Sequence, residues 1–462
     1  MQAKRQTIQL ELALEPEAKG EARRPGPQGT EVCVARAGPE HPAAGRGPSM
    51  EAVAEPGNLR KALARVRRNK GAPGIDGMTV GELGAYLKDH WPETKSRLLD
   101  GTYEPQPVRR VEIPKASGGI RPLGVPTVLD RFIQQAVMQV LQGDWDGSFS
   151  DASYGFRPGR SAHQAVERAQ EHIRAGFAIV VDLDLEKFFD RVNHDILMGL
   201  VAQRVADKRL LKLIRGFLTA GVLDGGLVGP TTEGVPQGGP LSPLLSNLML
   251  DVLDKELEKR GHRFVRYADD CNIYVRSQRA GERVMASVTR FLARRLKLRV
   301  NAAKSAVDRP AVRAFLGFSF TGGQTLKRRI APQALARFKA RVREMTRRTR
   351  RVSLARLVAE LSRYLLGWRG YFGFCETPSV LLRLDQWVRR RLRAFVWRQW
   401  KRGRPRFAAL RRLGINRHLA AKTAGSAHGP WRLSNSPALA YALPNAFFAR
   451  LGLAPLRCRP TA

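Results

Sequence analysis

Two adjacent carboxylates, Asp269 and Asp270, stand in the stretch HRFVRYADDCNIYVRS between two segments with the composition of β-strands. Earlier in the chain, the stretch FAIVVDLDLEKFFDRVNHDIL (177–197) begins as an apolar, β-branched strand and then changes to helical spacing. Asp182 and Asp184 are two residues apart at the end of that strand, so both face the same side of it. If this strand lies beside the hairpin, one of these acids meets Asp269 and Asp270.

Three carboxylates within a few ångströms of one another cannot all remain ionised without a compensating cation. Magnesium prefers oxygen ligands, and two Mg²⁺ ions about 4 Å apart are the known arrangement for in-line nucleotidyl transfer. Taken singly, the ADD sequence could be a solvated turn and Asp184 a helix cap. The order of the acids and their positions beside strands together favour a metal-dependent centre. The periodicity of the strand does not decide between Asp182 and Asp184.

The elements that hold these acids belong to a large and strongly basic chain. Its 462 residues, 43% of them hydrophobic, can form two or three domains with their own cores. The formal charge of +39 indicates a polyanionic partner, first of all nucleic acid, although a highly soluble or membrane-surface protein is an alternative. We expect no membrane span and no signal peptide. Four scattered cysteines without a CxxC pair favour a reducing cytoplasm over a disulfide framework or a zinc site.

Charge and composition divide the chain into four segments. Residues 1–56 form a leader that begins rich in Pro, Gly and Ala and is expected to be disordered or weakly ordered. Residues 57–326 contain nearly all the acidic motifs. Residues 327–417 hold 27 Lys and Arg and only four acids, which predicts a basic helical module that grips nucleic acid. Residues 418–462 form a short basic tail.

The YADD hairpin, preceded by DLEKFFD, resembles the palm of reverse transcriptases. Further blocks occur in the order found in bacterial group II intron-encoded reverse transcriptase/maturases: NKGAPGIDGMTV, VEIPKASGGIRPLGVPTVLDRFIQQAV, FSDASYGFRPGRSAHQAV, GVPQGGPLSPLLSNLMLDVLD, LKLRVNAAKS and FLGFSF. The resemblance covers about residues 57–420, and within it residues 361–403 are similar to the thumb, or maturase domain. It implies an α+β right-hand polymerase, with fingers and palm built on antiparallel sheet and followed by an α-helical thumb.

By this resemblance, Asp184, Asp269 and Asp270 are the catalytic, metal-binding carboxylates, and the backbone carbonyl of Leu185 supplies a further ligand. The family places an aromatic residue five positions after the first acid. That register favours Asp184 over Asp182.

Lys115 and Arg121 stand six residues apart in IPKASGGIRPLG, which reads as two short strands joined by a turn at residues 117–119. Across that turn the two cations could converge on one point and neutralise a triphosphate. On an isolated hairpin they would more often be solvated surface residues. The resemblance implies that they hold the phosphates of the incoming nucleotide.

The resemblance also assigns three residues nearer the palm. Phe189 corresponds to the aromatic gate that excludes a 2′-hydroxyl beneath the sugar, while its neighbour Phe188 is the better candidate for core packing. Gln237, in the shaped loop VPQGGPLSP, is expected to contact the nucleotide. Lys304, in NAAKS, is expected near the leaving pyrophosphate, although a single lysine at a strand end is usually only exposed.

The basic module has a helical pattern of its own. Apolar residues from Leu354 to Leu366 recur at helical spacing with arginines outside that face, which predicts a helix bundle laid on a phosphate backbone. We expect RNA binding by four clustered arginines: Arg389, Arg390, Arg391 and Arg393. One of them could instead hold the thumb together, because they span little more than one turn. The interleaved tryptophans are more often core residues than base-stacking ones.

These features predict an RNA-directed DNA polymerase and maturase that binds its group II intron RNA, assists splicing and copies the intron into DNA during retrohoming. The expected partners are intron RNA, an RNA template, a DNA primer or target, deoxynucleoside triphosphates and two Mg²⁺ ions. We leave open whether the protein is a homodimer, and we expect a cytoplasmic, nucleoid-associated ribonucleoprotein. Nothing after residue 420 resembles the endonuclease of many relatives, so the endonuclease-less type is expected.

Two other classes of function remain as alternatives. One is an RNA-binding splicing factor with an idle polymerase, against which the intact acidic residues argue. The other is a reverse transcriptase outside introns, of the retron, diversity-generating or CRISPR-linked kind, against which the long block at 361–403 argues.

Overall fold

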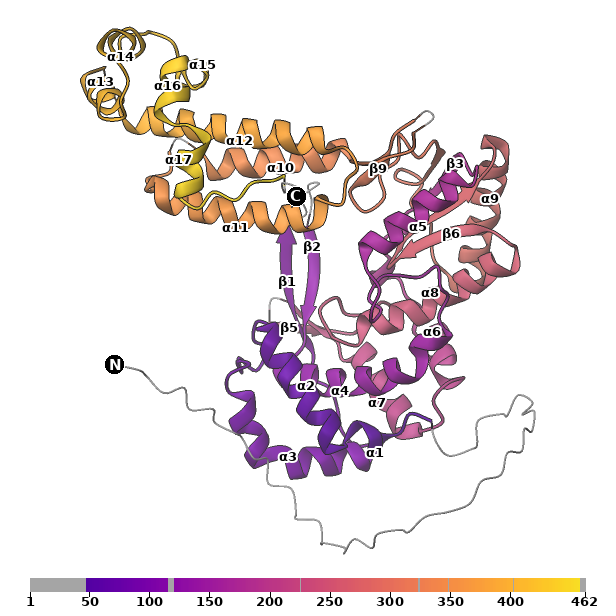
Figure 1. Cartoon of the computed structure of the whole chain (residues 1–462). Helices are drawn as coiled ribbons and strands as arrows, with labels where there is room; N and C mark the ends of the chain where they lie inside the picture. Colours follow the sequence, from indigo (N-terminus) through magenta and orange to yellow (C-terminus); the bar gives the residue numbers. More distant parts are fainter. Residues whose placement is uncertain are drawn as a thin grey trace, which may run out of the picture.

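A computed structural model describes residues 47–114, 120–224, 226–322, 325–347, 349–401 and 403–457 of the chain. Figure 1 shows three parts in space: a helical part with a long hairpin formed by the N-terminal third, a part built around a sheet, and a bundle of long helices near the C-terminus. These parts correspond to the fingers, palm and thumb that the sequence predicts. The mixed α+β, right-hand architecture is therefore confirmed.

The fingers combine helices with a four-stranded sheet in the order β2-β1-β4-β5. Their helices are α1 (Met50–Val53), α2 (Pro56–Asn69), α3 (Leu83–Leu99) and α4 (Val128–Trp145). The strands are β1 (Val108–Pro114), β2 (Ile120–Val125), β4 (Val222–Asp224) and β5 (Leu227–Gly229). Strands β1 and β2 pair antiparallel from Arg109–Val125 to Pro114–Ile120, which makes the hairpin predicted around residues 117–119. The turn itself lies outside the described residues.

The leader predicted over residues 1–56 is too long, because its last residues belong to the folded part of the chain. Met50 and Val53 of α1 are each 1% exposed and belong to the same core as α4. The backbone N–H of Met50 also donates a hydrogen bond of 2.9 Å to Asp207 Oδ2. Residues 47–56 are therefore part of the fingers, because α1 buries its apolar side chains; residues 1–46 lie outside the described part of the chain.

The palm is a four-stranded antiparallel sheet in the order β6-β7-β3-β8. Its strands are β3 (Ile179–Leu183), β6 (Arg263–Tyr267), β7 (Asp270–Val275) and β8 (Ala306–Asp308). Its helices are α5 (Ala162–Arg174), α6 (His194–Ala202), α7 (Lys208–Thr219), α8 (Ser242–Lys259) and α9 (Gln278–Phe291). Short helical turns occur at Asp146–Ser148, Phe188–Asp190 and Leu292–Leu296.

Alternate side chains of the palm strands enter two different cores, as the two-residue period of a strand requires. In β3, Val181 and Leu183 pack with the fingers and α8, whereas Val180 packs with α5 and the thumb. In β6, Phe264 and Val265 divide in the same way. The sheet is therefore covered on both faces, and it joins the two cores.

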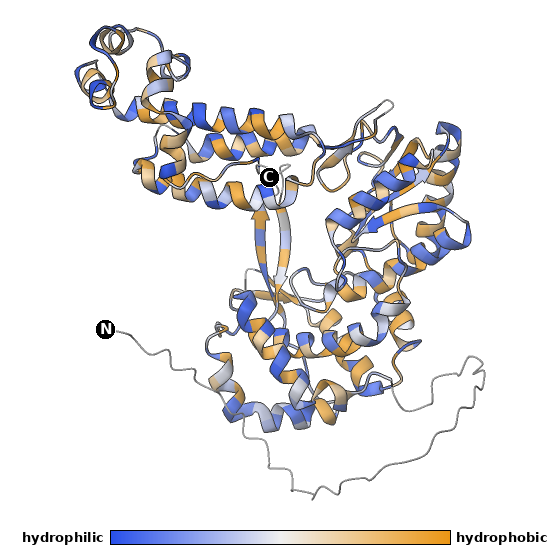
Figure 2. Cartoon of the chain, viewed as in Figure 1, coloured by the Kyte–Doolittle hydropathy of each residue, from blue (hydrophilic) through white to orange (hydrophobic). Residues whose placement is uncertain are grey.

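The thumb follows a short hairpin of β9 (Phe318–Phe320) and β10 (Arg328–Ile330). Its long helices are α10 (Pro332–Met345), α11 (Leu354–Phe372) and α12 (Pro378–Gln399). Five shorter helices follow: α13 (Gly403–Arg412), α14 (Arg417–Ala424), α15 (Pro430–Leu433), α16 (Pro437–Ala442) and α17 (Asn445–Arg450). Figure 2 shows hydrophobic and hydrophilic residues alternating along the thumb helices, as expected for amphipathic helices.

The helical pattern predicted from Leu354 onward is confirmed in α11, where Leu357, Val358, Leu361 and Leu365 are buried. Leu366 differs from the prediction, because it is 46% exposed. Trp397 is fully buried, in agreement with a core role for the tryptophans.

The C-terminal tail packs on the thumb instead of standing apart from it. Leu439, Phe448 and Leu456 are fully buried in the core that contains α10, α11 and α12. The Ser362 hydroxyl donates to the carbonyl of Gly452, and Asp385 Oδ1 accepts from the backbone N–H of Leu456. We therefore treat residues 418–457 as part of one unit with the thumb. None of the helices in the described ranges is long and apolar enough to span a membrane.

Candidate active site

The catalytic hairpin is the tight connection between β6 and β7. Tyr267 pairs with Asp270, so only Ala268 and Asp269 form the turn. On the other side of β7, Leu183 is the partner of Cys271. The next residue of the chain, Asp184, therefore leaves β3 beside the end of β7 where Asp270 begins. The register brings Asp184, Asp269 and Asp270 to one edge of the palm sheet, as the spacing of the motifs predicts.

Negative charge accumulates at this edge. Desolvation by the surrounding protein, followed by the charges of Asp269, Asp182 and Asp184, raises the pKa of Asp270 to about 7. The side chain of Asp270 nevertheless stays open to solvent, so water screens part of this effect. A carboxyl with a pKa near neutrality indicates that the site needs positive charge to hold all its acids ionised.

The structure separates the two acids between which the strand period could not decide. The Arg313 guanidinium donates to Asp182 Oδ2 from Nε at 2.9 Å and from Nη2 at 2.6 Å. Asp184 Oδ2 is buried and accepts no hydrogen bond within the described ranges, but it lies 3.0 Å from Lys304 Nζ. That contact is an ion pair by distance, without hydrogen-bond geometry. Asp182 thus has a structural partner, whereas Asp184 faces an ammonium group that a metal ion could replace.

The donor chemistry of the site suits a hard cation, although the side chains are not arranged around one. Among the described residues, no three His, Cys, Asp or Glu side chains stand close enough together to hold a single metal ion. Three carboxylates at one sheet edge are nevertheless the oxygen donors that Mg²⁺ prefers. Leu185, expected to contribute its carbonyl, is buried and lies in an isolated β-bridge with Val300. A cation entering here would displace Lys304 from Asp184.

The two phenylalanines of EKFFD have different environments. Phe188 is 2% exposed in the core, and Phe189 is half-buried and meets the ring of Phe188 edge-on at 5.2 Å. Phe189 and Gln237 line the same cavity of about 300 Å³ between the palm and the β1–β2 hairpin. The Gln237 amide donates to Asp190 Oδ1 at 3.0 Å, which ties the VPQGGPLSP loop to the segment that carries Phe189.

Close backbone contacts shape this loop. The N–H of Val235 donates to the carbonyl of Phe189 at 2.6 Å. Gly238 has φ +140°, and a Cβ there would lie 2.6 Å from the carbonyl oxygen of Gly124. Glycine is required at this position because any side chain would collide with β2.

The two residues expected to hold the triphosphate cannot be placed fully. Lys115 lies outside the described residues. The backbone of Arg121 pairs with Ile113 in the β1–β2 hairpin, but its side chain is outside the described part of the structure. Their role therefore remains a prediction.

A buried network beneath the catalytic turn was not foreseen from the sequence. Arg266 and Asp254 are both fully buried and form an ion pair with a shortest contact of 2.5 Å. The same guanidinium donates to Asn247 Oδ1, to Ser153 Oγ and, at 2.9 Å, to the carbonyl of Ala268 in the turn. The sequence feature that could have indicated this network is the arginine within the apolar strand segment FVRY.

The turn also depends on a close approach from the YGF segment. Ala268 adopts φ 56°, a left-handed conformation that is unfavourable for residues other than glycine. A Cβ on Gly155 would lie 2.3 Å from the backbone nitrogen of Ala268. The turn is therefore held from one side by Arg266 and packed from another by a residue that must be glycine.

The four arginines expected to face RNA are instead occupied within the protein. Arg389 pairs with Asp385 at 3.1 Å, and Arg391 donates to the Thr346 hydroxyl. The other two reach the tail, since Arg390 donates to the Trp431 carbonyl and Arg393 to the Leu443 carbonyl. Burial lowers the pKa of Arg391 and Arg393. Two of these arginines therefore hold the tail and two hold other parts of the thumb, and their binding of RNA remains a prediction.

The fold and the acidic edge define a polymerase of the reverse transcriptase class, and comparison with known families agrees. Residues 113–320 match the model described as reverse transcriptase (RNA-dependent DNA polymerase). Residues 335–414 match the group II intron, maturase-specific domain. The chain belongs to the group II intron-encoded reverse transcriptase/maturases, and the second match disfavours a reverse transcriptase outside introns.

Two relatives illustrate this membership. The chain is 33% identical over 320 residues to protein YkfC of Escherichia coli (strain K12), covering 61% of this chain and 83% of YkfC. It is 44% identical over 159 residues to the group II intron-encoded protein LtrA of Lactococcus lactis subsp. cremoris. That alignment covers 34% of this chain but only 26% of LtrA.

Proposed function

We propose that this protein polymerises DNA on an RNA template and, as a maturase, binds its own group II intron RNA, assists its splicing and copies it into DNA. The observation that carries the proposal is the strand register that places Asp184, Asp269 and Asp270 at one edge of the palm sheet, in a chain that continues into a maturase-specific domain. The specific partners proposed are the intron RNA, a DNA primer or target and deoxynucleoside triphosphates. A nucleoid-associated location remains part of the proposal, and the oligomeric state stays open.

We infer that Asp184, Asp269 and Asp270 hold two Mg²⁺ ions, with the carbonyl of Leu185 as a further ligand. Bound there, the ions would supply Lewis-acid activation of the primer 3′-hydroxyl and charge neutralisation of the triphosphate. Lys304 is close enough to Asp184 to turn toward the departing pyrophosphate once a cation takes its place. The raised pKa of Asp270 supports this assignment, because a second positive charge would allow that carboxyl to ionise at neutral pH.

The nucleotide would lie in the cavity between Phe189 and Gln237. The ring of Phe189 would limit the space beneath the sugar and so disfavour a 2′-hydroxyl. Its position is fixed from behind by Phe188 and by the hydrogen bond from Val235 to its carbonyl. Lys115 and Arg121 would hold the phosphates from the side of the β1–β2 hairpin.

The decisive experiment is primer extension on an RNA template with Mg²⁺ and deoxynucleotides. Asp269→Asn should abolish extension, because it removes a charged metal ligand while preserving the shape of the side chain. Asp89→Asn, on the exposed surface of α3, is the matched control and should extend like the wild type. Extension by Asp269→Asn at the wild-type rate would refute the metal assignment. Absence of extension by the wild type would refute the polymerase proposal.

A further inference from the structure

A large cavity that the polymerase site does not use lies in the thumb. It has a volume of about 1040 Å³ and is bounded by α10, α12 and the short helix α15 of the tail. Its rim contains four exposed arginines: Arg343, Arg347, Arg398 and Arg432. Within the described ranges, no ion pair joins any of these four to a carboxylate, and Glu344, the acid of the lining, pairs with Arg341. The cavity therefore offers unneutralised positive charge around its opening.

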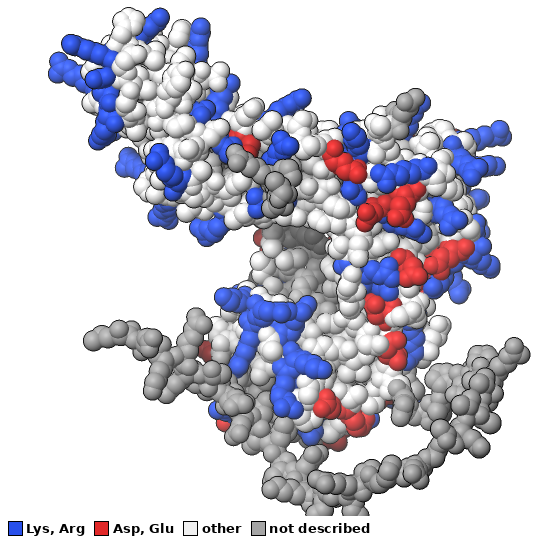
Figure 3. All heavy atoms as spheres, in the orientation of Figure 1, with Lys and Arg blue, Asp and Glu red and all other residues white. Residues whose placement is uncertain are grey.

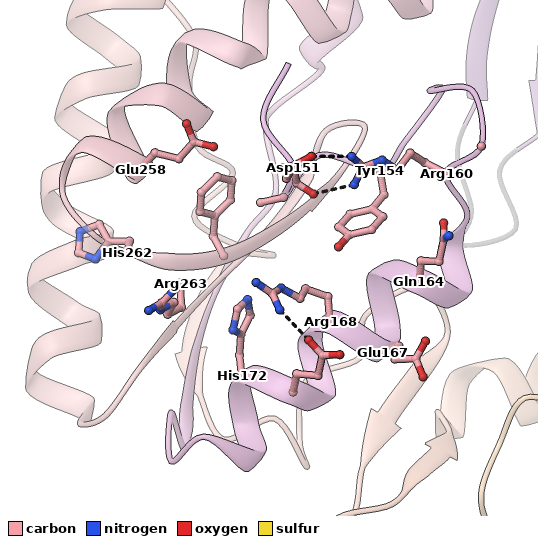
Figure 4. Close-up of a pocket in the computed structure, with 14 residues that line it drawn as sticks. Asp151, Tyr154, Arg160, Gln164, Glu167, Arg168, His172, Glu258, His262 and Arg263 are labelled. Atoms are coloured by element: carbon pink, nitrogen blue, oxygen red, sulfur yellow. Dashed lines mark hydrogen bonds and ion pairs between the residues drawn. The ribbon is translucent and has the colours of Figure 1, made fainter. Parts of the chain in front are cut away.

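The electrostatics of a second cavity, behind the palm, are different. Figure 4 shows charged side chains from α5 and the 151–160 loop lining a space of about 560 Å³. Arg160 pairs with Asp151 and Arg168 with Glu171. Burial, followed by the charge of Arg168, lowers the pKa of His172 to about 4, so this residue is neutral at physiological pH. The lining of the palm cavity holds four acids and three arginines, so this cavity does not attract a polyanion, in contrast to the thumb cavity.

The thumb cavity also presents an aromatic surface. Trp431 is 41% exposed, although most tryptophans of globular proteins are largely buried. The Arg390 guanidinium lies over its ring, 4.0 Å from the centroid, and donates to its backbone carbonyl. These contacts hold the indole in place while leaving part of it open. Phe395 and Ala394 supply apolar surface in the same cavity.

A fixed aromatic ring beside unneutralised arginines is the combination by which proteins bind single-stranded nucleic acid. The aromatic face takes a base of any sequence, and the cations take the phosphates on either side. The volume of about 1040 Å³ is slightly above the range of roughly 300–1,000 Å³ for ordinary ligand pockets, which leaves room for a nucleotide and its flanking phosphates. Figure 3 shows Lys and Arg spread over the thumb and tail and little acidic surface there, so the surroundings add to the attraction.

We propose that the thumb and tail together form a binding groove for an unstacked nucleotide of single-stranded RNA. The base would stack on Trp431, and the phosphates would lie among Arg343, Arg347, Arg398 and Arg432. This inference rests on the proposed function, which supplies RNA as the partner. It also assigns a role to the tail, since Trp431 and Arg432 lie beyond the maturase-specific domain at residues 335–414.

The first test is photocrosslinking. The probe is a 20-nucleotide single-stranded RNA that carries 5-iodouridine, with an unlabelled primer–template added in excess to fill the polymerase groove. After irradiation and proteolysis, mass spectrometry should find RNA attached to the peptide that contains Trp431. Crosslinks elsewhere on the protein but not on this peptide would overturn the proposal.

The second test is fluorescence anisotropy with the same RNA sequence, labelled with fluorescein. Trp431→Ala should weaken binding by roughly 5- to 150-fold, the range measured for loss of one base–aromatic stack. Trp431→Phe should retain most of the affinity, because a ring remains. The double variant Arg398→Gln/Arg432→Gln should lower the slope of log affinity against log salt by up to about 1.4, which corresponds to two single-strand phosphate contacts.

A control variant with the same change in net charge distinguishes binding in the groove from attraction of RNA by the overall charge of the protein. Arg417, at the start of α14, and Arg450, in the tail, are exposed and do not line the cavity. Arg417→Gln/Arg450→Gln should therefore leave affinity and salt slope near those of the wild type. If both double variants weaken binding equally, the effect is one of net charge and the groove is refuted.

Trp431→Ala could also act by releasing the tail from α12. Limited proteolysis of the tail would detect such a release. RNA binding by the Arg398→Gln/Arg432→Gln variant then tests the groove separately, because these two side chains take no part in the contacts that hold the tail. Weakened binding by Trp431→Ala with a loosened tail, together with normal binding by Arg398→Gln/Arg432→Gln, would overturn the proposal. Primer extension by every variant should match the wild type. A wild type that neither extends primers nor binds RNA would instead refute the proposed function.

Discussion

The buried pair beneath the catalytic turn allows stability and active-site geometry to be separated by mutation. Arg266 is fully buried, holds Asp254 in an ion pair and donates to the carbonyl of Ala268. Burial raises the pKa of Asp254, and Arg266 is the main group that opposes this shift. Arg266→Met removes the guanidinium and leaves Asp254 buried without a counter-charge. Breaking a buried pair in this way costs about 3–5 kcal/mol of unfolding free energy, a large part of the roughly 5–15 kcal/mol typical of a folded protein.

The double variant Arg266→Met/Asp254→Leu removes both charges. Replacing a whole buried pair by apolar side chains is often close to neutral, so most of the lost stability should return. The hydrogen bond to Ala268 does not return, because methionine has no donor. The turn that carries Asp269 and Asp270 then loses its anchor while Ala268 remains in a strained conformation. A displacement of about 1 Å at reacting groups can lower a rate by 10²-fold.

Urea unfolding and primer extension measure the two effects. We expect the double variant to be nearly as stable as the wild type yet to extend a primer about 100-fold more slowly. The matched control is Arg260→Met, which breaks the half-buried Arg260–Glu256 pair at the C-terminal end of the adjoining α8 without touching the turn. Extension by the stable double variant at the wild-type rate would refute the positioning role of Arg266.

Three further predictions follow from the same structure. Without metal, the raised pKa of Asp270 means that the folded protein keeps a proton that the unfolded chain releases near pH 3.8. The free energy of unfolding should therefore fall by about 1–2 kcal/mol as the pH rises from 4 to 7. Urea titrations in EDTA should show this decrease, and Asp270→Asn should abolish it. Phe189→Val should raise ribonucleotide relative to deoxynucleotide incorporation, whereas Phe188→Val should mainly lower stability, by about 1–3 kcal/mol; an increase in ribonucleotide use only with Phe188→Val would show that the register is displaced by one. Arg390→Gln/Arg393→Gln should loosen the tail, as measured by limited proteolysis, and should change the salt slope of RNA binding little. A large change in that slope with an intact tail would show that these arginines contact RNA directly.

The sequence by itself was enough to predict that the acids of the polymerase site lie at the ends of paired strands. Acids at the end of one strand and in a two-residue hairpin turn are local patterns, and antiparallel pairing then leaves few ways to arrange them. The different environments of Phe188 and Phe189 also agree with a local pattern, because neighbouring residues point in different directions, whereas the role of Phe189 as a gate remains a prediction. The amphipathic pattern of α11 likewise placed its buried face correctly at Leu357, Val358, Leu361 and Leu365, since helical periodicity is a local property.

Only the tertiary structure decided which groups contact each face of a strand or helix. Asp182 and Asp184 share one side of β3, and only Arg313, 131 residues from Asp182, makes one of them structural. The sequence predicted an open basic surface on α12, but the tail folds back, and its carbonyls accept hydrogen bonds from Arg390 and Arg393. Periodicity indicates which side chains point together. It carries no information about a distant segment that packs on them, because that contact depends on where the whole chain folds.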